Sequence, residues 1–181
     1  MNESNGRLFA NVVFRRMVFV ALAVFTIMLY LLPFGIFRQA LSLPDLVYCC
    51  VICVVIREPR AAPFWIIVPV MLIGDVFHMR PLGLWTLIVV CVAEAFRIAH
   101  VFFQNHGFVI AWIAAVIGYL VALGIQQIAL ILLFVPTPPL GQLFTMFVLT
   151  GVAYPLVSLV WAGLLGNRKP HRANTDRARV R

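Results

Sequence analysis

The chain has 181 residues, of which 64% are hydrophobic and 11% charged, and its formal charge is +8. A soluble domain carries about 25% charged residues, so the composition excludes an ordinary soluble enzyme or binding domain and indicates a protein whose solvent is lipid. Nucleic acid is not an expected partner, because most of the basic residues lie near the chain ends and no aromatic residue interleaves the basic C-terminal tail.

The first two predicted helices differ in length. An apolar helix is expected over residues 17–37, directly after two arginines. The second is expected to begin at Ser42, with a proline in its first turn and Asp45 completing a capping box, and to end at Ile56. Its length of about 22 Å falls short of the hydrocarbon core of roughly 30 Å, so we expect it to begin below the outer surface.

The rest of the chain predicts four more apolar helices. Two are expected over residues 62–79 and 84–99, and the polar stretch 100–107 is expected to be a connection. Two longer helices are expected over 108–134 and 141–165. Each of these two is long enough to cross a bilayer, since a span needs about 20 apolar residues.

Small residues recur at helical spacing in the fifth predicted helix. Ala114, Gly118 and Ala122 form a stripe that lets a neighbouring helix approach closely. The large residues Ile117 and Leu123 are expected to face lipid or to pack loosely. A leucine at position 118 is therefore expected to disrupt the packing.

The distribution of basic residues predicts the topology. Twelve of the 14 lysines and arginines fall on one side of the predicted membrane, and only Arg38 and Arg80 fall on the other. Because cytoplasmic loops carry the excess of basic residues, both chain ends are expected in the cytoplasm. We expect a six-helix transmembrane domain over 15–166, between a tail at 1–14 and a basic tail at 167–181, in an inner membrane.

Three cysteines lie close together in the second predicted helix. Cys49, Cys50 and Cys53 are expected to behave as small hydrophobic residues within an apolar run. The alternative, a metal site, would need a fourth ligand and a dry pocket. No metal and no cofactor is expected.

Asp75 is an acidic residue inside the third predicted helix, about four residues from its outer end. Asp45 lies on the same side, and Arg38 and Arg80 are next to them in sequence. Charged groups at membrane depth are costly and usually face the interior of a bundle. Three interpretations stay open: a polar lock between helices, a proton or ion relay, and a contact with a basic residue of a partner.

Towards the cytoplasmic side, Glu94 is expected to pair with Arg97, three residues later on the same helix. The serines and histidines give no reason to expect that they converge, so serine–histidine chemistry is not predicted. We therefore do not expect an enzyme.

The stretch from Arg57 to Gly83 resembles a known family. Its motifs are Arg57–Pro59, Pro63–Trp65, Gly74–Asp75 and Pro81–Gly83, separated by apolar residues. This run resembles MreD, the rod shape-determining membrane protein family of bacteria. Chain length, short loops and about six predicted helices are similar to that family as well.

The resemblance implies an all-α, polytopic fold like that of the substrate-binding component of energy-coupling-factor transporters. It implies a non-enzymatic scaffold of the elongasome, which synthesises side-wall peptidoglycan and maintains cell shape. The implied partners are MreC, the synthase formed by RodA and a class B penicillin-binding protein, the MreB filament indirectly, and membrane lipids. The alternative is a vitamin-uptake component. Such components typically have two alanines four residues apart in the first helix, whereas Ala21 and Ala23 are only two residues apart.

Overall fold

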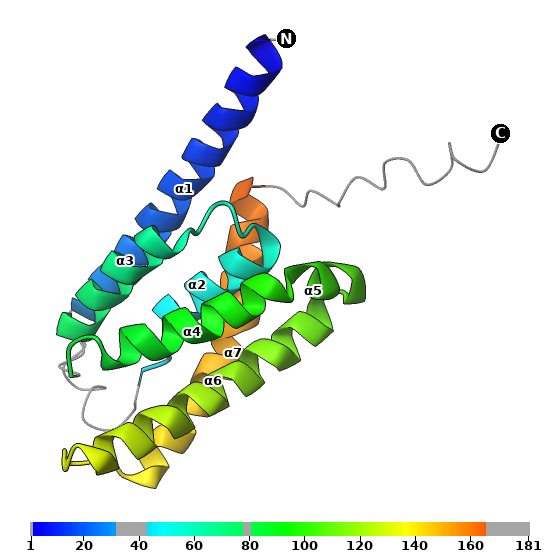
Figure 1. The fold of residues 1–181 in the computed structure, drawn as a ribbon. Coiled ribbons are helices and arrows are strands. Elements are labelled where there is room, and N and C mark those ends of the chain that lie inside the picture. The colour runs from blue at the N-terminus through cyan, green and yellow to red at the C-terminus, as the bar shows by residue number, and fades with distance from the viewer. Residues whose placement is uncertain (1, 32–42, 78–80, 166–181) are drawn as a thin grey trace.

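The computed structural model describes residues 2–31, 43–77 and 81–165, and within them it contains helices, turns and no strand (Figure 1). This confirms the all-α fold class. The helices are, in chain order, α1 (Asn2–Leu31), α2 (Leu46–Arg57), α3 (Phe64–Phe77), α4 (Leu84–Ile98), α5 (His100–His106), α6 (Phe108–Leu132) and α7 (Leu140–Leu165).

Helix α2 forms the centre of the bundle. Its ten consecutive residues from Val47 to Ile56 are all buried, and it contacts every other helix. It packs most extensively against α7, whereas α1, α3, α4 and α6 complete the enclosure. An apolar helix without a polar face is stable in this position because all of its sides meet other side chains.

Three helices are long and apolar enough to cross a membrane: α1 through its stretch Asn11–Leu29, α6 and α7. The pair α4 and α5 passes the same test together but is bent by 62° at its break. The remaining helices, α2 and α3, are apolar but have only 12 and 14 residues. At 1.5 Å per residue they are about 18 and 21 Å long.

The start of α2 differs from the prediction. The helix begins at Leu46, and its N-cap is Asp45, whose side chain accepts a hydrogen bond from the backbone N–H of Tyr48. Pro44 therefore precedes the helix instead of lying in its first turn. Ser42, the predicted first residue, lies outside the described residues.

Two segments predicted to be non-helical are helical. Residues 2–14, predicted as a tail, continue α1, and Figure 1 shows this part of the helix extending away from the bundle. Residues 100–106, predicted as a connection, form α5. The side-chain amide of Gln104 in α5 donates to the carbonyl oxygen of Arg57 at 3.2 Å, because the last carbonyls of α2 lack partners within their own helix.

Of the two large residues of α6 that were expected to face lipid or to pack loosely, one is exposed and the other is buried. Ile117 is 55% exposed, as expected. Leu123 is only 6% exposed, so the expectation that it faces lipid was wrong. It lies one turn after the buried Tyr119 and therefore shares its inward face.

Candidate functional site: two buried carboxylates and a close helix crossing

Asp75 joins α3 to the beginning of α4. Its side chain is buried, with 1% exposure. Its Oδ2 atom accepts hydrogen bonds from the backbone N–H of Gly83 at 3.1 Å, the backbone N–H of Thr86 at 3.3 Å and the Thr86 hydroxyl at 2.8 Å. The carboxylate thus caps α4 from another helix, where its negative charge also interacts favourably with the helix dipole.

Gly83 explains why the cap comes from elsewhere. It is the N-cap residue of α4 and has φ 85°, a left-handed conformation that glycine adopts without strain. Glycine has no side chain with which to cap the helix, so Asp75 supplies the acceptor. The turn also contains Pro81, whose carbonyl oxygen accepts from the backbone N–H of Leu84 at 3.3 Å.

Asp45 performs a similar task at α2 but is anchored to a different helix. Its Oδ1 accepts from the backbone N–H of Tyr48 at 3.0 Å, and its own backbone N–H donates to the hydroxyl of Thr150 in α7 at 2.9 Å. The thiol of Cys49 donates to the carbonyl oxygen of Thr150 at 3.5 Å. These bonds fix the start of α2 against the middle of α7.

The predicted cluster of two carboxylates and two arginines is only partly described. Asp75 bonds to α4 and Asp45 to α7. Arg38 and Arg80 lie outside the described residues, so their pairing with either carboxylate stays a prediction. Within the described part of the chain, Oδ1 of Asp75 has no hydrogen-bond partner.

Gly118 lies at a close crossing of α6 with α2 and α4. A Cβ atom at this position would approach Cε2 of Phe96 to 2.8 Å and the hydroxyl oxygen of Tyr48 to 3.1 Å. The Tyr48 hydroxyl donates to the carbonyl oxygen of Ala115, one turn earlier, at 3.0 Å. The close neighbours of Gly118 are therefore aromatic side chains, whereas the sequence led us to expect a neighbouring backbone.

An aromatic cluster surrounds this crossing and was not predicted. The ring of Tyr119 in α6 lies 4.9 Å from that of Tyr48 and 5.9 Å, edge-on, from that of Trp85 in α4. Tyr48 and Tyr119 also line, with residues of α7, a cavity of about 10 Å³. The one feature of the sequence that could have indicated this cluster is position, because Tyr48 and Trp85 lie within one turn of the starts of α2 and α4.

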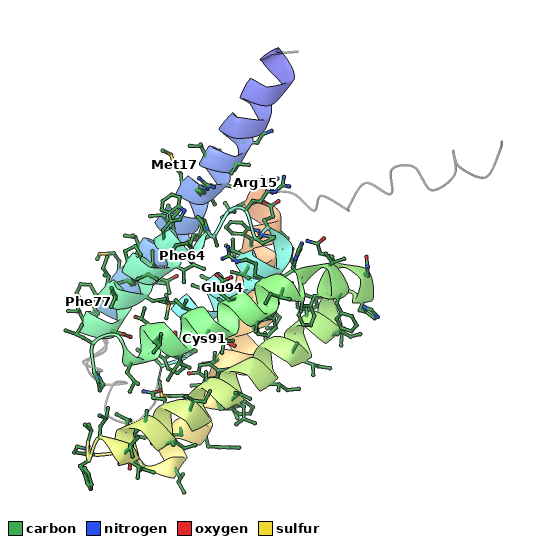
Figure 2. All side chains as sticks on the ribbon, in the orientation of Figure 1. Arg15, Met17, Phe64, Phe77, Cys91 and Glu94 are labelled. Carbon is green, nitrogen blue, oxygen red and sulfur yellow. The ribbon has the colours of Figure 1, made fainter. Side chains whose placement is uncertain are left out.

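Glu94 and Arg97 form the predicted pair. Oε2 of Glu94 lies 3.3 Å from Nε of Arg97, three residues later in α4. Figure 2 shows where Glu94 and the exposed Cys91 lie along this helix. Among the described residues, no group of three or more histidine, cysteine or acidic side chains could hold a metal ion.

Searches against protein families, curated proteins and solved structures found no match to the chain.

Proposed function

We propose that the chain is a non-enzymatic membrane scaffold of the MreD type, which supports side-wall peptidoglycan synthesis and cell shape in the bacterial inner membrane. The observation that supports the proposal is the position of the described residues of the motif run from Arg57 to Gly83. Its described residues form the end of α2, the turn after it, α3 and the turn before α4. Its aspartate and its glycine meet in one hydrogen bond, so the motif builds a joint between helices, as a scaffold requires.

The proposed membrane arrangement has six spans: α1, α2, α3, α4 with α5, α6 and α7. The three long apolar helices support it, and so do the many large apolar side chains that face outward on α1, α3, α6 and α7. The short α2 is compatible with it because its side chains are covered by protein and Gln104 of α5 donates to its last carbonyl oxygens. The excess of basic residues favours cytoplasmic chain ends.

A transport component that binds a vitamin is the rival function. Ligand pockets usually have volumes of about 300–1,000 Å³. The cavity between α2, α6 and α7 has about 10 Å³, which is scarcely enough for one water molecule. This described cavity is far too small for a vitamin, which favours the scaffold.

Co-purification tests the proposal. The tagged full chain is extracted in mild detergent from its own host and the retained proteins are identified by mass spectrometry, with an unrelated six-span protein carrying the same tag as the control. We expect MreC, RodA and the class B penicillin-binding protein to be enriched. Enrichment of energising ATPases instead would support the vitamin-transport function and overturn the scaffold.

A further inference from the structure

Arginine side chains gather at the turn between α2 and α3. One of them belongs to the turn itself, one ends α2, two reach it from α1, and one reaches it from α4. Arg16 donates from Nε to the carbonyl oxygen of Arg60 at 3.3 Å, and Arg97 donates from Nη2 to the carbonyl oxygen of Ala62. The five arginines are Arg15, Arg16, Arg57, Arg60 and Arg97.

Carboxylates neutralise only part of this charge. Arg15 pairs with Glu58, and Arg97 pairs with Glu94. Among the described residues, Arg16 and Arg60 have no carboxylate within ion-pair distance, so these two are the cations available to an anion from outside the chain.

Arg16 is held in place before any ligand arrives. Besides its bond to the turn, its guanidinium lies over the ring of Trp65, 5.4 Å from the ring centre. Trp65 is 56% exposed. A tryptophan with one face on a cation and the rest outside is typical of the membrane–water interface, where its ring sits at headgroup level.

An apolar surface continues from the basic turn along α1 and α3, which pack against each other. Met17, next to Arg16, is 67% exposed, and Phe64, next to Trp65, is 59% exposed. Figure 2 shows both side chains directed away from the bundle. Further exposed apolar residues on these two helices are Val24, Phe25, Leu72, Ile73 and Val76.

We propose that this place binds an anionic phospholipid, with its phosphate at Arg16 and Arg60 and its acyl chains along the outer face of α1 and α3. Guanidinium groups match the oxygens of a phosphate group with paired hydrogen bonds. The adjoining apolar surface requires acyl chains, which free phosphate lacks. The inference rests on the proposed membrane location of the chain, and on no particular partner protein.

The test is a lipid titration of the purified full chain in mild detergent, read by native mass spectrometry. Dioleoyl phosphatidylglycerol is compared with dioleoyl phosphatidylcholine, which has the same acyl chains and no net charge. We expect tighter binding of phosphatidylglycerol, weakened about fivefold by Arg16→Gln or Arg60→Gln and about thirtyfold by both. Because the Arg60 side chain is exposed, Arg60→Gln is expected to fold normally, which thermal unfolding checks.

The control removes the same charge elsewhere, through Arg177→Gln with Arg179→Gln in the basic tail, and is expected to change the affinity less than twofold. Equal binding of the two lipids, or an equal loss in the tail control, would overturn the proposal. Displacement of phosphatidylglycerol by millimolar inorganic phosphate would also overturn it, in favour of a simple anion site. Normal co-purification of cell-wall partners alongside such a result would sink this inference and leave the proposed function standing.

Discussion

The carboxylate of Asp75 does for α4 what the glycine at its N-cap cannot do. Asp75→Asn keeps an oxygen that accepts from Thr86 but removes the charge at the helix N-terminus, so we expect a loss of about 1–2 kcal/mol of stability. Unfolding of the detergent-solubilised protein measures it. If the two side chains act together, Asp75→Asn combined with Thr86→Val should cost less than the sum of the single changes.

The Asp75→Asn variant distinguishes two of the open interpretations, the polar lock and the contact with a partner. If Asp75 instead contacts a basic residue of a partner, Asp75→Asn leaves the isolated protein stable while co-purification and rod shape are lost. A variant with unchanged stability, partners and cell shape would contradict both the lock and the contact.

Gly118 gives the second residue-scale prediction. Gly118→Leu is expected to destabilise the protein by about 1–3 kcal/mol, because even its Cβ meets Phe96 and Tyr48 below normal contact distance. Gly124 in the same helix is the matched control, since a Cβ there meets nothing within 4 Å. Gly124→Ala should be neutral or slightly stabilising, as alanine favours helices. Equal tolerance at both positions would show that the crossing at Gly118 is loose.

At the scale of helices, apolar runs predicted the order of six of the seven described helices and the approximate extent of five; α1 begins at Asn2, well before the predicted start at residue 17. Their ends were harder, because a helix end depends on which side chain reaches it. Asp45 and Ser42 are both good N-caps by residue type. The helix begins after Asp45, whose backbone N–H is also hydrogen-bonded to Thr150 of α7. The hydrogen bonds from Thr86 to the Asp75 carboxylate join two separate helices, so no local sequence pattern predicts them.

Helix α5 was missed for a similar reason. Its sequence is short and polar enough to read as a connection, and its contacts with α2 and α6 provide its stability. Leu123 was placed on the wrong face because only the small residues of α6 were expected to face the bundle, whereas its buried face also holds Tyr119 and Leu123. Residue type predicted the close crossing at Gly118, and only the fold identifies what lies opposite.

The cap that α5 provides is testable. Gln104→Ala removes the donor to the carbonyl oxygens of Ile56 and Arg57, and we expect a loss of about 1 kcal/mol. The neighbouring Asn105 is exposed and serves as the control, with Asn105→Ala expected to change little. Thermal unfolding in detergent compares the two. A loss at Asn105 as large as that at Gln104 would assign the effect to α5 helicity instead of the cap.

For the whole molecule, the proposed topology makes a direct prediction. Thr137 lies in the turn between α6 and α7, and Arg181 ends the chain. A reporter that is active only in the periplasm should be active when fused at Thr137 and inactive at Arg181, because the basic residues favour a cytoplasmic chain end. The reverse pattern would overturn the orientation and move the lipid site to the other leaflet.

The enclosure of α2 has a consequence for how the protein is made. Synthesis produces α2 before α7, which covers it most and holds Asp45. In the proposed membrane arrangement, a 12-residue helix is too short to cross the bilayer alone. The nascent chain must therefore keep α2 in a provisional place, at the insertion machinery or against α1 and α3, until α7 has been made. Burial of α2 is thus a closing step that waits for α7.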